Sequence, residues 1–367
     1  MDTKKFLNIP EISAGTKFWM IRTKDGYFFN EYIREGFIAI GWNLIRESSF
    51  PLTKSQDESF KNIIKEKYKN VQPGSSINKC YKFCCEIKTG DIAVIVGRTD
   101  IAFAKIGDYY EDDNPEFTIE KELEINKKIE DGVHASEVLC PYIKRRKIEI
   151  INLIKYSNDI NPYFFKALAA NRHSLSRADK HADIILSTCY DAYIYHNTLS
   201  IAFRVDKKDS INAIAFSHFI SYFSNYLIGI NKDSISIKTA LNSPGDIVLQ
   251  ISDWLWGNGL AIIVAYFALF GGKIGSWEIP SVWNVIKYFI ERHDKDEIQK
   301  VETLGKTLDN EMKKEEIRAL RLKNDELEKL QHALPEMERV AQQLEIRMPK
   351  DNIIDLDAIK REISFRD

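Results

Sequence analysis

Short apolar runs punctuated by glycines are the main pattern of the first 150 residues. The runs of strand length are residues 17–22, 37–40, 92–96, 101–106 and 135–142. Between them, residues 26–35 carry aromatic side chains at helical spacing, and residues 54–69 form an amphipathic helical pattern that ends at Pro73. Short strands that end at glycines are typical of small antiparallel barrels. The pattern therefore predicts a small β-barrel domain over residues 15–156.

Residues 163–291 alternate between helix and strand patterns. Residues 193–205 predict a β-hairpin that turns at 196–197, because both flanks are rich in β-forming side chains. Residues 211–228 predict an apolar helix, and residues 234–241 predict a further strand. A mixed α+β domain is expected here, after a boundary marked by a cluster of turn-forming residues.

The remaining chain, residues 293–367, is rich in charge. Leucines recur at steps of three and four residues within a background of Glu, Lys and Arg, which is typical of an exposed helix or short coiled coil. Pro335 would kink such a helix or end one segment of it. We expect a charged helical, coiled-coil-like segment whose residues 293–348 contact a protein partner or a second copy of the chain. A helical hairpin packed on its own domain is an equal alternative.

The length and charge of the chain limit its organisation and its partners. Its 367 residues exceed the size at which one hydrophobic core stops growing, so two domains and an appendage are expected. With 52 basic and 54 acidic residues, no global positive field would hold the whole chain on nucleic acid. The start of the chain lacks an apolar signal segment, and the five cysteines show no disulfide-like spacing. These features favour the cytoplasm.

Residues 260–270 form an unbroken apolar run. A membrane-spanning helix needs about 20 such residues, and Gly257 and Gly259 interrupt the longer window. A buried core helix is therefore favoured, and the Ser-Pro-Gly-Asp sequence at 243–246 is interpreted as its cap. A membrane-acting effector through residues 254–272 is kept as an alternative.

Aromatic, glycine and acidic residues follow one another in a defined order through the first domain. They are Phe18, Trp19, Phe28, Phe29, Tyr32, Gly41 and Trp42, then Tyr81, Phe83, Gly90 and Asp91, then Gly107, Tyr109 and Tyr110, and last His134 and Val138. In this order they resemble the PUA/EVE-like domains at the front of Mrr-type and other modification-dependent restriction proteins. The resemblance does not extend past residue 160. In it, residues 134–138 correspond to the closing strand of the barrel.

The resemblance implies a pocket that accepts a flipped, often modified, base. Stacking on aromatic side chains contributes about 1–3 kcal/mol per base, and extruding a base costs a few. Candidates for the pocket are Trp19, Trp42, Tyr81, Phe83 and Tyr109, with Asp91 or Arg98 reading the polar edges of the base. In so small a barrel Trp19 and Phe83 are more simply explained as core residues. Trp42, next to a glycine at a strand end, is the stronger candidate.

Basic side chains of the same domain are candidates for phosphate contacts. They are Lys79, Lys82, Lys144, Arg145, Arg146 and Lys147. The alternative interpretation is a solvated basic surface without a partner, which is the more frequent role of such runs.

No catalytic motif or metal site is readable from the sequence. Cys80, Cys84 and Cys85 lie close together, but a closed zinc site needs four ligands, and only His134 and Cys140 offer a second pair. Buried structural cysteines are favoured, and neither a metal nor a cofactor is expected.

These observations lead to one expected function and one rival. We expect a bacterial anti-phage defence or restriction-associated protein that senses nucleic acid, including modified DNA, with DNA favoured over RNA. An enzyme is not favoured. The rival is an effector nuclease or nucleotide-processing enzyme with its site in residues 163–291, for which His173, Asp183 and Arg204 are the residues to suspect.

Overall fold

The computed structural model divides the chain into two compact units, Ile12–Tyr190 and Met1–Glu11 with Asp191–Asp367. The structure describes residues 9–68, 71–155, 164, 166, 168, 173–205, 213–214, 216–218, 221, 235–240, 245–251, 339–340 and 343–347. Helices and strands both occur in it, so the expected mixed α+β class is confirmed.

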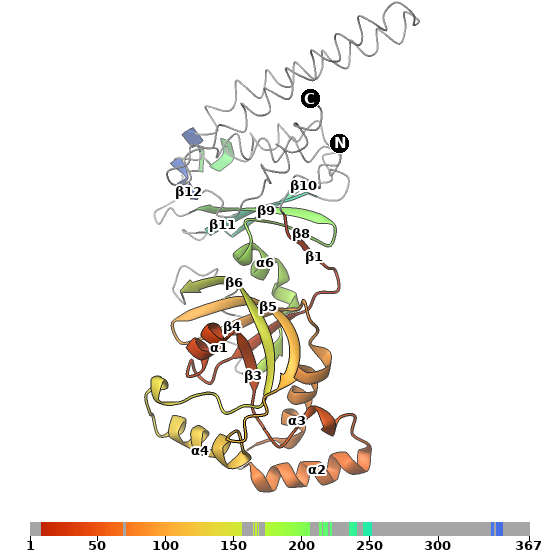
Figure 1. Cartoon of the computed structure of the whole chain (residues 1–367). Coiled ribbons are helices and arrows are strands. Elements are labelled where there is room, and N and C mark those ends of the chain that lie inside the picture. Colours follow the sequence, from red (N-terminus) through yellow and green to blue (C-terminus); the bar gives the residue numbers. More distant parts are fainter. Residues whose placement is uncertain are drawn as a thin grey trace, which may run out of the picture. The chain divides into compact units, whose positions relative to one another are not determined.

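The first unit is built on a curled six-stranded sheet that forms a half-barrel (Figure 1). The strand order is β3 (Phe37–Ile40), β6 (Lys144–Lys155), β5 (Asp100–Glu111), β4 (Ile92–Val96), β2 (Phe18–Arg22) and β7 (Leu175–Arg177). β2 and β4 run parallel, and the other neighbouring pairs are antiparallel. The ladder between β5 and β6 shifts register between Phe103 and Ala104 and again between Ile106 and Tyr109. Such irregularities bend strands, which lets the two longest strands curl around the core.

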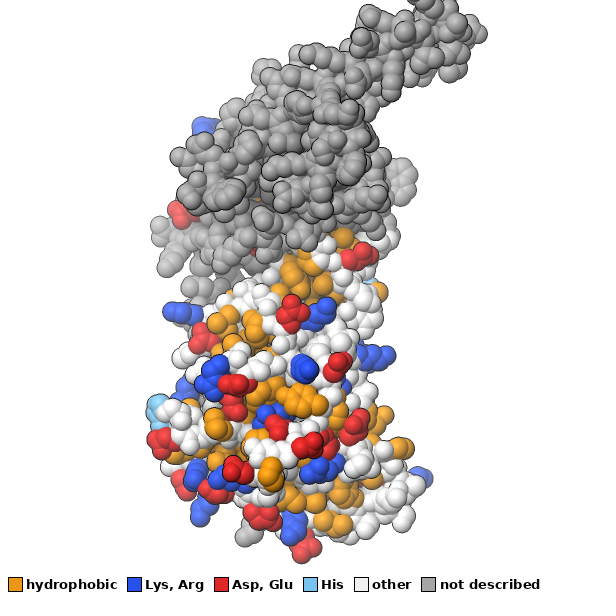
Figure 2. Space-filling view, in the orientation of Figure 1, with side chains coloured by type: hydrophobic (Ala, Val, Ile, Leu, Met, Phe, Trp, Pro, Cys, Tyr) orange, Lys and Arg blue, Asp and Glu red, His pale blue; other side chains and the backbone are white. Residues whose placement is uncertain are grey.

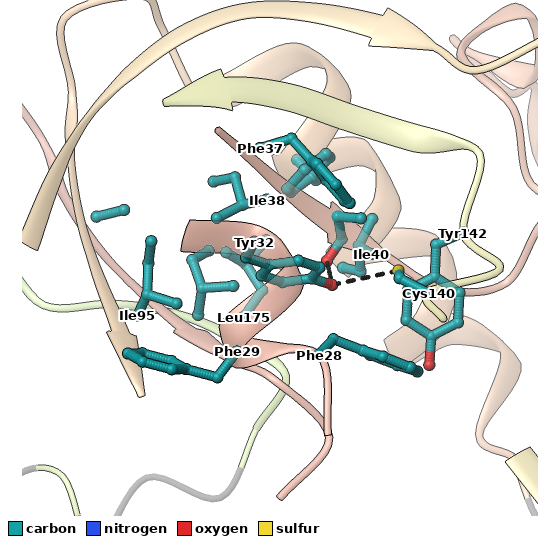
Figure 3. Packing of buried hydrophobic residues seen from close by; sticks show 14 of the residues in the cluster. Phe28, Phe29, Tyr32, Phe37, Ile38, Ile40, Ile95, Cys140, Tyr142 and Leu175 are labelled. Atoms are coloured by element: carbon teal, nitrogen blue, oxygen red, sulfur yellow. Dashed lines mark hydrogen bonds between the residues drawn. The ribbon is translucent and has the colours of Figure 1, made fainter. Parts of the chain in front are cut away.

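The concave side of the sheet holds an aromatic core. Trp19 and Ile21 alternate inward from β2, and helix α1 (Phe29–Glu35) adds Phe29 and Tyr32. The Tyr32 hydroxyl points toward Cys140 and donates to the Ala39 carbonyl oxygen at 3.1 Å (Figure 3). The buried polar group is thereby satisfied inside an otherwise apolar cluster.

Three helices lie together at one end of this sheet (Figure 1): α2 (Lys54–Lys67), α3 (Pro73–Tyr81) and α4 (Ile119–Glu130). The Thr53 and Thr118 side chains accept backbone N–H groups at the starts of α2 and α4, which satisfies donors that a helix start leaves free. A five-residue π-helix, η3 (Lys82–Glu86), continues α3. A second, smaller core forms there from Ile45, Ile64, Tyr68, Ile77 and Cys80.

The predicted amphipathic helix ends before Pro73, as expected, and Pro73 itself begins a further helix, α3, since its fixed φ suits a first turn. One sequence expectation for this unit is wrong. Residues 135–142 do not form a strand; a 3-10 turn, η4 (Ala135–Glu137), occupies their start, and the strand that follows is β6. The backbone N–H of Cys140 is bound by the Glu31 carboxylate (2.7 Å), so this donor is used by a side chain instead of a strand partner.

The first unit also extends past the expected boundary near residue 157. β7 pairs with β2, and it is followed by the short turn η5 (Asp179–His181) and helix α6 (Ala182–Cys189). The sheet of the first unit thus includes β7, whose residues the sequence analysis assigned to the next domain.

The second unit contains another six-stranded sheet. Its order is β1 (Glu11–Ile12), β8 (Ala192–Tyr195), β9 (Thr198–Val205), β11 (Gly245–Ile251) and β10 (Ile235–Ala240), with β12 (Ile346–Arg347) also paired to β9. The predicted hairpin is confirmed as β8–β9, and its turn residues His196 and Asn197 both have positive φ, as a tight two-residue turn requires. The predicted strand at 234–241 is confirmed as β10.

The Ser-Pro-Gly-Asp sequence was expected to cap a helix, and this expectation is wrong. Gly245 and Asp246 open strand β11, which pairs with both β9 and β10. The β-branched residues Ile247 and Val248 that follow suit a paired strand better than a first helical turn.

Other expectations fall mainly outside the described residues. Of the predicted helix at 211–228, residues 213, 214, 216–218 and 221 are described, and they are helical. The apolar run at 260–270 and most of the charged segment at 293–367 lie outside the described residues. Within the described part, no helix has the length and apolar character needed to cross a membrane.

Candidate functional site

The loop that follows β3 carries the strongest of the candidate residues. We call residues 41–50 the Trp42 loop. Trp42 adopts a left-handed conformation with φ of 62°, and its half-buried ring packs against both cores of the first unit. A left-handed backbone is unfavourable for a bulky side chain, and residues held in this way cluster at functional sites.

Glu122 of α4 holds the start of the Trp42 loop. Its side chain is buried, and its carboxylate accepts hydrogen bonds from the backbone N–H groups of Trp42 (2.6 Å) and Asn43 (2.8 Å). The Tyr68 hydroxyl donates to the same carboxylate at 2.8 Å. Burial, and then the neighbouring Glu122 charge, raise the pKa of Tyr68, so the hydroxyl remains a donor at neutral pH. Three donors offset the cost of burying this negative charge.

Lys144 of β6 binds the carbonyl oxygen of Trp42. Its side chain is fully buried, and Nζ donates to the Trp42 carbonyl oxygen at 2.8 Å. The Asn43 side chain donates to the Pro141 carbonyl oxygen (2.8 Å) and accepts from the Ile143 N–H (3.2 Å). The first residues of the loop are thus attached by backbone and side chain to buried polar groups.

Glu111, at the end of β5, holds the second half of the loop. Its carboxylate accepts from the Glu47 N–H at 2.9 Å and forms an ion pair with Arg46 at 3.1 Å. The Tyr109 hydroxyl donates to it at 2.9 Å. Because Arg46 is exposed, the ion pair itself contributes little, and the backbone contact is the more effective restraint.

The outer side of the site combines aromatic rings with a cation. The Lys79 ammonium lies 5.5 Å from the centre of the Trp42 ring, and partial burial lowers the pKa of Lys79. Tyr81, which is 40% exposed, meets the ring of Phe50 edge-on at 5.4 Å. Such a surface can bind a flat aromatic ligand that carries negative charge.

Three of the candidate pocket residues have structural roles. Trp19 is fully buried and donates from Nε1 to the Asp91 carboxylate at 2.8 Å. Asp91, also buried, accepts from the backbone N–H groups of Lys17 and Lys88, both at 3.0 Å. Phe83 is fully buried in the aromatic core. These side chains hold the sheet together and do not face the outside of the protein.

Arg98 lies away from the other candidates. Asp91 directly precedes β4, and Gly97 stands between the end of β4 and Arg98, so the five strand residues alone place about 17 Å of extended chain between them. The Arg98 guanidinium instead lies 5.6 Å from the centre of the Tyr27 ring. Asp91 and Arg98 therefore cannot read two edges of one base. Tyr109, by contrast, lies at the Trp42 end of the sheet, where it contacts Glu111.

The basic run at the start of β6 is buried for three of its four residues. Arg145 pairs with Asp112 at 2.7 Å, and Arg146 donates to four backbone carbonyls. Lys144 is fully enclosed, as described above, so these three cations act inside the fold. Lys147 is exposed and Lys82 half-buried. Over the coloured surface in Figure 2, acidic and basic side chains are interspersed with hydrophobic ones, so attraction to phosphate would be local.

The thiols near the site are poor nucleophiles. Burial raises the pKa of Cys80 to about 12 and that of Cys84 to about 11, and a protonated thiol reacts slowly. In the described part of the chain, no group of three His, Cys, Asp or Glu side chains is placed to hold a metal ion.

Sequence reasoning missed Glu122 and Asn43, which shape the site. Glu122 lies on the same face of α4 as the buried Ile125 and Ile129. A carboxylate on the apolar face of an amphipathic helix is a signal that could have been read, because such a charge must find buried donors.

The residues suspected under the enzyme alternative fall in both units. His173 and Asp183 are exposed residues of the first unit, whereas Arg204 belongs to β9 of the second.

Comparison with known proteins adds one finding. Residues 17–125, from the start of β2 into α4, match the model of a domain of unknown function, DUF8426. No curated protein and no solved structure matches the chain. The matched segment contains Trp42, Lys79, Glu111 and Glu122, so one domain model spans most of the site.

Proposed function

We propose that the first unit is a PUA/EVE-like reader domain that binds nucleic acid by stacking a base on Trp42. The proposal includes modified bases, favours DNA over RNA, and assigns the chain to restriction-type, anti-phage defence in the bacterial cytoplasm. Lys79 supplies the nearest positive charge for a phosphate, and Tyr81 and Phe50 extend the aromatic surface.

One observation carries the proposal: a half-buried tryptophan is held in an unfavourable backbone conformation by buried charges on both sides of its peptide. Such rigid placement reduces the entropy lost when a ligand binds. The order of aromatic and glycine residues along the first domain, and the curled sheet with its aromatic core, also support it.

Binding to short oligonucleotides tests the proposal. Purified protein is titrated with unmodified, methylated and hydroxymethylated oligonucleotides at two salt concentrations, together with the Trp42→Ala variant. Stacking of a base on an aromatic side chain contributes about 1–3 kcal/mol, so Trp42→Ala should weaken binding about 5-fold to 150-fold.

Tyr27→Ala is the matched control, because Tyr27 is a half-buried aromatic residue that contacts Arg98 at the other end of β4. It should bind as the wild type does. Binding that depends only on salt, and that Trp42→Ala leaves unchanged, would refute the reader function.

A further inference from the structure

We propose that Glu122 and Lys144 are positioning residues that clamp the Trp42 peptide and thereby set the orientation of the Trp42 ring for binding. This inference rests on the proposed function, which assigns the stacking surface to Trp42. Neither residue touches the ligand in this account. They act through the backbone of a third residue.

The clamp consists of two opposite charges on the two ends of one residue. The Trp42 N–H donates to the Glu122 carboxylate at 2.6 Å, and the Trp42 carbonyl oxygen accepts from Lys144 Nζ at 2.8 Å. Glu122 is 2% and Lys144 0% exposed, so both charged side chains are shielded from water. Hydrogen bonds to buried charged groups are stronger than neutral ones.

Lys144 also has few competing partners. Among the residues that the structure describes, neither Lys144 nor Glu122 belongs to an ion pair. The Trp42 peptide therefore lies between two buried charges that are not paired with each other. If the Trp42 backbone moved away, each buried charge would lose a hydrogen-bond partner. This cost holds Trp42 in place.

The backbone conformation is the reason that a clamp is needed. Trp42 has φ of 62°, a region that bulky residues avoid, and without restraint the peptide would relax to negative φ and turn the ring away. Gly41 lets the carboxylate approach, since a Cβ at that position would lie 2.9 Å from Glu122 Oε1. The sequence Gly-Trp at the end of β3 is thus matched to a buried glutamate 80 residues later.

A double-mutant cycle tests the clamp. Binding of a hydroxymethylated oligonucleotide is measured for wild type, Glu122→Gln, Trp42→Ala and the double variant, at low salt so that residual phosphate binding remains measurable. Loss of one charged hydrogen bond predicts that Glu122→Gln weakens binding about tenfold in the wild-type background. In the Trp42→Ala background it should change binding less than about twofold, because the residue it positions is gone. Equal weakening in both backgrounds would overturn the proposal.

A spectroscopic readout separates the clamp from the reader function. In protein labelled with ¹⁵N-tryptophan, the Trp42 amide proton, bound to a carboxylate, should resonate downfield and move upfield in Glu122→Gln. Tyr27→Ala, which alters an aromatic residue next to Arg98 at the other end of β4, is the control and should leave this resonance in place. An unmoved Trp42 resonance in Glu122→Gln refutes the clamp whatever the binding data show. If wild type binds no oligonucleotide, the reader function fails, and the resonance still decides the clamp.

A second variant guards against a general loss of structure. Lys144→Met keeps the length and apolar part of the side chain but removes the donor to the Trp42 carbonyl oxygen. Thermal unfolding identifies whether each variant is folded at the temperature of the assay. A folded Lys144→Met protein should bind the oligonucleotide more weakly than wild type, and this weakening should be much smaller in the Trp42→Ala background. Unchanged binding by Lys144→Met would contradict the clamp.

Discussion

Replacing Arg146 with lysine tests how the end of the sheet near the site is held together. The guanidinium is buried, and burial lowers the pKa of Arg146. It donates to the backbone carbonyl oxygens of Phe83 (2.8 Å), Cys84 (2.9 Å), Ile87 (2.7 Å) and Gly107 (3.2 Å). One side chain thereby joins the π-helix η3 to strand β5.

The expected cost follows from the geometry of the two side chains. A guanidinium spreads its donors over a planar fork, whereas a lysine amine is a single point and cannot reach acceptors on both sides. If two carbonyls lose their donor, at about 1–3 kcal/mol each, Arg146→Lys loses about 2–6 kcal/mol of stability. This is a large part of the stability of an ordinary domain.

Hydrogen exchange of the amides in residues 82–111 measures this loss within the first unit. At about 1.4 kcal/mol for each factor of ten, the slowest amides should lose about 30-fold to about 10⁴-fold of their protection. Lys147→Ala is the control, because Lys147 is the exposed neighbour on the same strand, and it should change stability by less than about 0.5 kcal/mol. A loss of protection below about fivefold in Arg146→Lys would refute the reasoning.

Three further predictions follow from buried polar groups of the first unit. Trp19→Phe removes the donor to Asp91 and should cost about 1–3 kcal/mol, measured by urea unfolding; no loss would contradict the structural role of this indole. Burial raises the pKa of Glu31 above its ordinary value of 4.5, so ionising it costs more in the folded state, and wild type should lose stability relative to Glu31→Gln as the pH rises through that region. A pH-independent difference would contradict this sign. Of the five cysteines, Cys85 is the exposed one and should react first with a thiol reagent, whereas the others should require unfolding; rapid labelling of Cys80 would contradict its burial.

Local patterns in the sequence predicted much of the first unit correctly. The runs that became β2, β3 and β4 are almost wholly apolar, and the helix at 54–69 became α2, which buries Ile64 and packs Phe60 against the second core but leaves Ile63 exposed. The hairpin β8–β9 of the second unit was predicted from the β-forming residues on both sides of the turn at 196–197, and both turn residues have positive φ in the structure. These features depend on residues close together in the chain, so the sequence alone carries them.

Features that depend on contacts between residues far apart in the sequence were not predictable in the same way. Residues 138–143 are apolar, yet the N–H groups of Cys140 and Ile143 are bound by the side chains of Glu31 and Asn43, and no strand forms there. The basic run of β6 was interpreted as a solvated surface or, less often for such runs, as a set of phosphate contacts. Lys144, Arg145 and Arg146 are instead buried, because carbonyl groups and one aspartate from other elements satisfy their donors.

The candidate site shows the same division between sequence and structure. Trp42 was singled out from its position next to a glycine at a strand end, and the structure adds that its backbone is left-handed, with φ of 62°. The sequence by itself therefore determined most strands of the first unit and the aromatic residues of its core, and it singled out Trp42 as a candidate. Only the tertiary structure decided that Glu122 and Lys144 hold that residue, because hydrogen bonds to a backbone peptide depend on where the chain folds and leave no periodic pattern in the sequence.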